Sequence, residues 1–319
     1  MGEFELIRQY FAAAACARAG GDVVLGIGDD CALLSVPAGE QLAVSTDSLT
    51  AGVHFPDHCD PYLLGQRALA VSTSDLAGMG AAPIGFTLAL TLPSVDPAWL
   101  AEFARGLDAM AAGCAMRLIG GDTTRGPLSM TLTVFGRVPA GTSLLRSGAQ
   151  PGDLLCVGGA LGDAAGALAS VLGERPNDSA ETAALLRRYW SPQPQLALGQ
   201  ALRGKATAAL DISDGLLADC AHIAAASGVA LQIELSRLPL SDALLSVVDV
   251  ERAVQCALAG GDDYLLAFTL PAAELPLLLD NGWPIHVVGQ VRVGEGVQLL
   301  DANGDVVAPR HRGYNHFPS

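Results

Sequence analysis

The sequence predicts a mixed α/β protein of two domains. Its 319 residues are too many for one typical domain of ~150 residues and suit two. Half of the residues are apolar, and β-prone apolar runs alternate with alanine-rich helical runs along the chain. A segment rich in Gly and Pro, 139–152, interrupts this alternation. We therefore expect an N-terminal domain over 1–148 and a C-terminal α/β domain over 149–319.

The first half is expected to form a mixed sheet with helices. Apolar and β-branched runs predict strands over 23–28, 41–46, 86–92 and 128–138. Alanine-rich runs predict helices over 61–79 and 97–112, and Pro97 suits the first turn of the second helix.

The second half repeats this organisation without an internal sequence repeat. The same signals predict strands over 153–157, 207–212, 231–235, 256–258, 264–270 and 286–291. Helices are expected over 162–172 and from the glycine of "DISDG" through Ala226, with a polar loop over 174–179.

Composition excludes several function classes. The formal charge of −15 disfavours a nucleic acid or an anionic membrane as partner, because both attract a basic surface. Lys205 is the only lysine, so phosphate chemistry would have to use metal ions, arginine and backbone N–H groups. Seven cysteines without a Cys-x-x-Cys pair argue against a disulfide framework or a zinc site. We expect a soluble protein in a reducing compartment, the cytoplasm.

Aspartates recur beside small and hydroxyl residues, and we expect them at strand ends. They lie in "GIGDD", "STDSL", "SDLAGMG", "GGDTT" and "DISDGL", at Asp29, Asp30, Asp47, Asp75, Asp122, Asp211 and Asp214. Carboxylates and hydroxyls are hard oxygen ligands that suit Mg²⁺ bound together with substrate phosphates. A single Asp at a strand end is more often a capping residue. If these side chains converge, however, their repulsion would require cations.

The other motifs in the sequence do not indicate a specific functional site. The segment Gly26 to Cys31 lacks the third glycine of a dinucleotide fingerprint, and there is no P-loop. Pro56 separates His54 from His58, which excludes a zincin-like helix. His222 is most simply a structural histidine on a helix.

Seven segments together resemble the thiamine-monophosphate kinase family: "GIGDDCALL", "STDSLTAGVHF", "SDLAGMGA", "LIGGDTTRGPLSMTLTVFG", "RSGAQPGD", "DISDGLLAD" and "GGDDYLLAFT". The resemblance extends from about residue 3 to "RGYNHF". It implies a two-domain fold whose N-terminal domain binds ATP and metal and dimerises through its strands. It also implies phosphorylation of thiamine monophosphate to thiamine diphosphate with ATP and several Mg²⁺ ions.

The resemblance assigns roles to particular residues. It implies metal ligation by Asp30, Ser45, Thr46, Asp47, Asp75, Asp122, Asp211 and Asp214. Contacts to ATP are implied for Gly121, Asp122, Arg146 and Ser213, and contacts to thiamine monophosphate for His54, Asp262 and Tyr314. Of these, Asp30, Asp47, Asp75, Asp122 and Arg146 are expected to act in catalysis.

Two residues depart from the family pattern, which usually has Gly-Glu-Asp-Tyr-Glu. Here Asp262 replaces the first glutamate and Leu265 replaces the second. The shorter Asp262 puts its substrate contact in question, and Leu265 removes a carboxylate.

Three alternatives remain open. Related ATP-dependent enzymes include selenophosphate synthetase, which usually carries a reactive Cys beside an N-terminal Gly-rich segment, a context that Cys16 lacks. A hydrogenase maturation protein of the same superfamily ends in a functional Cys, whereas the last cysteine here is Cys256. A nucleotide-sensing module without turnover is the third alternative, and release of ADP in the presence of thiamine monophosphate would distinguish it.

Overall fold

The computed structural model describes residues 3–308, which form two compact units. Of the described residues, the N-terminal unit contains 3–76 and 81–141, and the C-terminal unit contains 77–80 and 142–308. The division falls inside the Gly- and Pro-rich segment 139–152. Within residues 3–308, no helix combines the length and the apolar character needed to cross a lipid bilayer.

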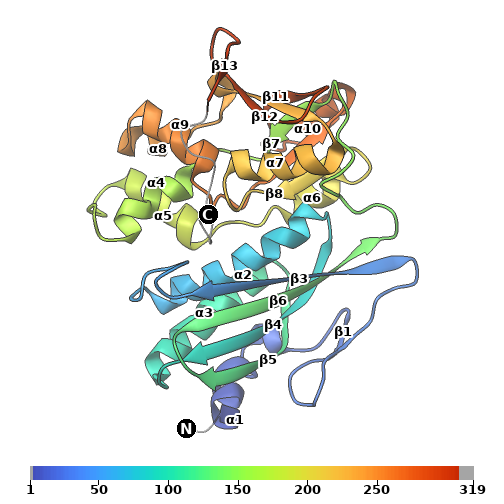
Figure 1. The fold of residues 1–319 in the computed structure, drawn as a ribbon. Helices are drawn as coiled ribbons and strands as arrows, with labels where there is room; N and C mark the ends of the chain where they lie inside the picture. The colour runs from blue at the N-terminus through green and yellow to red at the C-terminus, as the bar shows by residue number, and fades with distance from the viewer. Residues whose placement is uncertain (1–2, 309–319) are drawn as a thin grey trace. The chain divides into compact units, whose positions relative to one another are not determined.

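The N-terminal unit is built on a four-stranded mixed sheet in the order β3-β6-β4-β5 (Figure 1). Its strands are β3 (Glu40–Thr50), β4 (Ala82–Leu92), β5 (Arg117–Arg125) and β6 (Ser129–Pro139). Two long helices, α2 (Pro61–Gly78) and α3 (Pro97–Gly113), pack along this sheet. The chain begins with α1 (Glu3–Leu6), a π-helical turn η1 (Ile7–Phe11), a 3₁₀ turn η2 (Ala15–Ala17) and a small sheet of β1 (Val23–Leu25) and β2 (Leu33–Leu34).

Alternation along β6 shows which face of the sheet is covered. Met130, Leu132 and Val134 are fully buried, whereas the intervening Thr131 and Thr133 are only partly buried. One face of the sheet therefore forms the core of this unit, and the other carries hydroxyl side chains.

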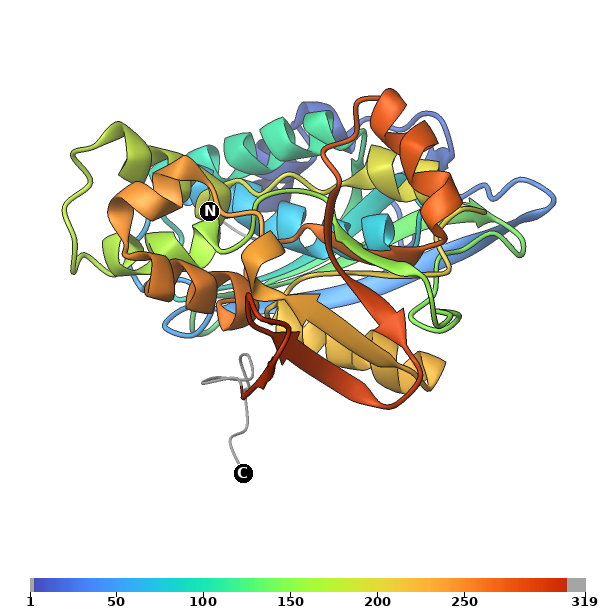
Figure 2. The same ribbon diagram turned by 90° about the horizontal axis from the view of Figure 1, so that it is seen from above.

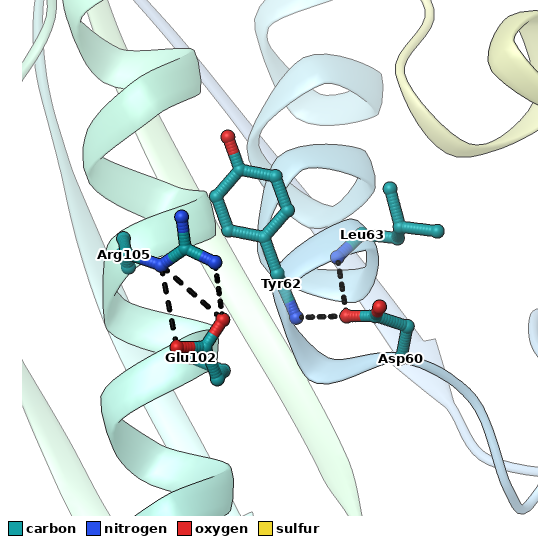
Figure 3. Close-up of polar contacts among 5 residues, drawn as sticks. All are labelled: Asp60, Tyr62, Leu63, Glu102 and Arg105. Atoms are coloured by element: carbon teal, nitrogen blue, oxygen red, sulfur yellow. Dashed lines mark hydrogen bonds and ion pairs between the residues drawn. The ribbon is translucent and has the colours of Figure 1, made fainter.

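Capping and a close helix contact fix α2 beside α3 (Figure 3). The Asp60 carboxylate accepts hydrogen bonds from the backbone N–H groups of Tyr62 (2.8 Å) and Leu63 (3.3 Å), and so caps the start of α2. The Arg105 guanidinium, paired with Glu102, lies 4.2 Å from the centroid of the Tyr62 ring. A side chain at Gly106 would place its Cβ 1.9 Å from the Tyr62 carbonyl oxygen, so this helix contact requires glycine.

The C-terminal unit is built on a seven-stranded sheet in the order β13-β12-β9-β11-β7-β10-β8 (Figures 1 and 2). Its strands are β7 (Leu154–Val157), β8 (Ala208–Asp211), β9 (Ala230–Glu234), β10 (Leu266–Leu270), β11 (His286–Arg292), β12 (Gly296–Leu300) and β13 (Val306–Val307). Its helices are α4 (Asp163–Val171), α5 (Ala180–Trp190), α6 (Leu196–Leu202), α7 (Leu216–Ser227), α8 (Asp242–Val247), α9 (Val250–Ala259) and α10 (Leu275–Asp280). Two 3₁₀ turns, η3 (Leu235–Arg237) and η4 (Ala272–Glu274), complete the unit.

The central strands of this sheet are buried on both faces. Leu155 and Val157 of β7 join an apolar cluster with residues of α7, while the intervening Cys156 joins a second cluster with residues of α6 and α10. Burial on both faces explains why β7, β8 and β10 are nearly continuous apolar runs.

One expected strand is a helix, and β5 is a strand that was not expected. Residues 256–258 form no strand but the end of α9, whose start is capped by the Asp249 carboxylate on the Arg252 N–H (2.8 Å). The short apolar run there is one buried face of a helix, with Ala253, Cys256 and Ala257 at helical spacing. Conversely, β5 was not expected, because its glycines and polar residues lack a strand signal.

Candidate active site

The first group of candidate residues joins β3 to α2 in the N-terminal unit. The Ser45 hydroxyl of β3 donates a hydrogen bond to the Asp75 carboxylate of α2. Burial and the charge of Asp75 together raise the pKa of Asp47 to about 6, while a hydrogen bond with Ser72 lowers it. The charges of Asp47 and Asp75 therefore lie close enough to repel each other.

This arrangement has the chemistry of a magnesium site. Among the residues that the structure describes, no cluster of three or more His, Cys, Asp or Glu side chains could hold a metal ion. Mg²⁺ does not need such a cluster, because it typically takes one or two carboxylates and completes its shell with water and phosphate oxygens. The paired carboxylates of Asp47 and Asp75, with the Ser45 hydroxyl, fit this requirement.

Thr46 points away from this group. Neighbouring side chains of a strand alternate between faces, and the Thr46 hydroxyl lies 2.9 Å from the Thr133 hydroxyl on the hydroxyl-bearing face of the sheet. Its side chain therefore does not join Ser45 and Asp47. Only the main chain of Thr46 remains near that group.

A second group lines a pocket at β5, the opposite edge strand of the sheet. The pocket, of about 680 Å³, is bordered by residues 7–12, 27–32 and 118–123 together with Leu88. It brings together Asp30, Gly121 and Asp122, which the sequence analysis selected separately. A Cβ at Gly121 would lie 1.9 Å from the Leu88 carbonyl oxygen, so the close contact of β5 with β4 requires glycine here.

The structure does not bring Asp122 to Asp47 within one chain. Strand pairing aligns Asp122 with Ala89, Thr131 and Ser48, whereas Asp47 is aligned with Leu132 and Leu88. Directly paired residues share a face, so Asp122 and Asp47 point to opposite faces. They also lie on opposite edge strands, three strand spacings or about 14 Å apart.

The third group lies at one end of the sheet of the C-terminal unit. The neighbouring strands β7, β10 and β8 bring together three loops, 158–162, 211–215 and 260–265. They carry Asp211, Ser213, Asp214 and Asp262, which the sequence analysis selected as metal ligands or substrate contacts. Asp211 ends β8 and is buried, while Ser213 and Asp214 are partly exposed.

Asp219 holds the loop that carries Ser213 and Asp214. Its buried carboxylate accepts hydrogen bonds from the N–H groups of Ser213 (3.0 Å) and Asp214 (3.1 Å). Burial raises the pKa of Asp219 to about 7, although the backbone hydrogen bonds favour the charged form. Asp219 lies within the quoted motif "DISDGLLAD", but nothing in the sequence marked it as the residue that anchors the loop.

The remaining candidates are dispersed. His54 follows β3, and its Nδ1 accepts a hydrogen bond from the Thr50 N–H (3.0 Å), which leaves the proton of the neutral ring on Nε2. Arg146 is exposed, and its carbonyl accepts a hydrogen bond from the Ser227 hydroxyl (3.1 Å). Tyr314 lies outside the described residues.

The placement of the aspartates at strand ends was only partly right. Asp211 does end β8, but Asp47 and Asp122 lie inside β3 and β5, and Asp75 lies in α2. The hydroxyl and glycine neighbours of these residues made the strands hard to delimit from sequence.

Comparison with known proteins identifies the family to which the chain belongs. The family model described as "AIR synthase related protein, N-terminal domain" matches residues 28–138, and the corresponding C-terminal model matches residues 150–300. The thiamine-monophosphate kinase of Escherichia coli K12 is 48% identical over 323 aligned positions, covering 99% of this chain and 98% of that protein. This chain belongs to the thiamine-monophosphate kinase family.

Solved structures of this family have the same fold. A thiamine-monophosphate kinase from Stenotrophomonas maltophilia K279a aligns with a TM-score of 0.83 and 44% identity, covering 90% of this chain and 92% of that one. AaThiL complexed with AMPPCP and TMP aligns with a TM-score of 0.80 and 30% identity, covering 91% and 92%. A hydrogenase maturation protein in complex with ATP aligns with a TM-score of 0.77 at 20% identity, which shows a shared fold alone.

The fold accounts for Leu265, where the family pattern usually has glutamate. Leu265 is buried in the apolar cluster around α7, and its side chain borders Gly159. A carboxylate in this apolar cluster would be desolvated.

Proposed function

We propose that this chain transfers a phosphoryl group from ATP to thiamine monophosphate at a site whose magnesium ligands include Asp47 and Asp75. Membership in the thiamine-monophosphate kinase family supports the reaction. The Asp47 and Asp75 carboxylates, with the Ser45 hydroxyl, are the observation behind the metal assignment, because a bound cation stabilises two carboxylates whose charges repel each other.

This reaction requires mainly that the protein position the two substrates. The acceptor is a phosphate oxygen that is already ionised at neutral pH, so no general base is required. Bound Mg²⁺ would neutralise charge on the phosphates during in-line transfer. The side chains then have to hold donor and acceptor in line, a task for which oxygen ligands and the exposed Arg146 guanidinium suffice.

The other candidates divide between metal and substrates. Asp30, Asp122, Asp211 and Asp214 would supply further metal contacts, and Thr46 would do so through its main-chain carbonyl. Gly121, Asp122, Arg146 and Ser213 would contact ATP. His54 and Asp262 would contact thiamine monophosphate, joined by Tyr314, which lies beyond the described residues.

A homodimer is part of this proposal. β3 is an edge strand that exposes Leu42 (45%) and Val44 (54%) along a sheet edge that other chains can cover. Moreover, the Asp47 group and the Asp122 pocket lie at opposite edges of one sheet. A single nucleotide–metal complex that uses both groups would need one group from each of two chains.

The cytoplasm is the proposed location. All seven cysteine thiols are free, and five of them are buried. The charge of −15 supports small phosphorylated substrates rather than nucleic acid or membrane as partners, because bound cations can mediate their contact with an acidic protein.

The decisive experiment measures ADP release by the full chain with ATP, MgCl₂ and thiamine monophosphate. Rapid release that depends on both Mg²⁺ and thiamine monophosphate is expected. Thiamine is the matched control acceptor: it offers a hydroxyl with no base to deprotonate it and should be turned over very poorly. Binding of ATP without release of ADP would instead indicate a nucleotide-sensing module, and efficient use of thiamine would indicate a hidden general base.

A further inference from the structure

The loop between α9 and β10 has an unusual backbone. Gly261, Asp262 and Tyr264 have φ angles of 68°, 64° and 48°. Residues other than glycine rarely adopt this left-handed region, at a cost of ~1–3 kcal/mol each, and such strain persists only where surrounding contacts impose it. Two strained residues within three positions therefore call for identifiable restraints.

Backbone hydrogen bonds supply the first restraint. The Asp262 N–H donates to the Ser213 carbonyl (2.9 Å), and the Tyr264 N–H donates to the Ile212 carbonyl (2.8 Å). The strained loop is thereby attached to the loop that carries Ser213 and Asp214.

The carboxylate of Asp263 supplies the second restraint. It accepts hydrogen bonds from the Gly162 N–H at 2.9 and 3.1 Å, which attaches the loop to the start of α4. Burial raises the pKa of Asp263 well above its usual range, helped by the nearby charges of Asp163 and Asp262 and opposed by Arg188. An acidic group kept in so unfavourable an environment indicates that its position matters more than its solvation.

The third restraint acts on the side chain of Asp262 itself. The Tyr264 hydroxyl donates a hydrogen bond of 3.2 Å to the Asp262 carboxylate. Because Asp262 is one methylene shorter than the glutamate usual in the family, its reach depends more on the backbone and on this hydrogen bond.

We propose that Asp263 and Tyr264 are positioning residues, which hold the strained loop 261–264 so that the Asp262 carboxylate is presented to thiamine monophosphate. Asp263 fixes the backbone of the loop, and Tyr264 fixes the direction of the Asp262 side chain. The inference rests on the proposed contact between Asp262 and thiamine monophosphate.

The test compares steady-state kinetics of Tyr264→Phe, Asp262→Ala and the double variant. Tyr264→Phe should raise KM for thiamine monophosphate by about 3- to 10-fold, with KM for ATP within about 2-fold, because it loses one hydrogen bond to a charged group. The double variant should match Asp262→Ala alone, since Tyr264 acts through Asp262. Tyr62→Phe, a tyrosine change in the other unit, is the matched control and should have no effect.

A Tyr264→Phe effect that persists in the Asp262→Ala background, or that raises both KM values equally, would overturn the inference. So would an unchanged KM in Tyr264→Phe when Asp262→Ala raises it. If Asp262→Ala itself leaves KM for thiamine monophosphate unchanged, the proposed substrate contact is refuted, and with it the presentation of Asp262 to that substrate.

Hydrogen exchange tests the role of Asp263 without reference to substrate. Asp263→Ala should speed exchange of the Asp262 and Tyr264 amides by at least about 10-fold, because the loop loses its attachment to Gly162. Asp263→Asn keeps an oxygen acceptor for the Gly162 N–H and should restore slow exchange. Equal exchange in wild type and Asp263→Ala would overturn the positioning role whatever Asp262 binds.

Discussion

The Ser45 hydroxyl on β3 donates a hydrogen bond to the Asp75 carboxylate on α2, across thirty positions of sequence. This bond holds Asp75 beside Asp47, the partly buried carboxylate whose pKa is raised to about 6. The contact joins β3 to α2, and no local sequence pattern predicts that these two elements lie together. The two carboxylates are expected to favour activity, because they bind Mg²⁺, and to lower the stability of the metal-free protein.

Asp47→Asn should separate these two effects. The amide keeps the shape but removes a charge that Mg²⁺ requires, so turnover should fall by at least about 10²-fold, equivalent to ~2.7 kcal/mol. Without Mg²⁺ at pH 8 the variant should unfold at a higher temperature than wild type, because a desolvated charge facing Asp75 is removed. Kinetics and calorimetry check both, with the exposed Asp280→Asn as control. Normal turnover in Asp47→Asn would refute the metal assignment.

Asp219 should make stability depend on pH. Its folded pKa of about 7 lies above the ordinary aspartate pKa of 3.8, so between these values the folded protein holds a proton that the unfolded chain has lost. Its contribution to stability therefore falls as pH rises from ~4 to ~7 and is constant above. Asp219→Asn removes this titration, so its melting temperature relative to wild type should be higher at pH 8 than at pH 5. A difference in melting temperature between the two proteins that does not change with pH would contradict the raised pKa of Asp219.

Mixed dimers test whether Asp47 and Asp122 act together across two chains. Co-expressed Asp47→Asn and Asp122→Asn chains form hybrid dimers with one intact site if each site takes one residue from each chain. Random pairing should then restore about a quarter of wild-type activity. The pair Asp47→Asn with Asp75→Asn is the control, because both residues belong to one group and no site stays intact. No recovery in the first mixture would place both residues in one chain's site or exclude the dimer.

Tyr314→Ala is expected to weaken the binding of thiamine monophosphate and to leave the binding of ATP unchanged. The family resemblance places this ring against thiamine, whose thiazolium charge would gain a cation–π contact of ~0.5–2 kcal/mol. KM for thiamine monophosphate should rise about 3- to 30-fold, with KM for ATP within about 2-fold and Tyr314→Trp tolerated. Equal effects on both substrates, or none, would make the C-terminal tail structural.

Several elements could be predicted because their signals are local, whereas helices α5, α6, α8, α9 and α10 were not expected. The helix expected over 61–79 is α2, and the strand expected over 286–291 is β11, each within two residues. The strand expected over 256–258 was wrong because three apolar residues match a strand as well as one face of α9. β5 was missed because its polar, glycine-rich sequence becomes a strand only by pairing with β4.

The sequence by itself determined the kinds of groups available: many aspartates beside hydroxyl residues, one lysine, and motifs of one kinase family. Which of these groups meet follows from the packing of the strands and helices. Strand alternation turns Thr46 away from Asp47, and sheet order separates Asp47 from Asp122 by three strand spacings. Asp263 reaches the Gly162 N–H, and loop 261–264 reaches the carbonyls of Ile212 and Ser213, only because loops distant in sequence are packed at one end of a sheet. The physical reason is that register and strand order come from non-local pairing and burial, which no local pattern encodes.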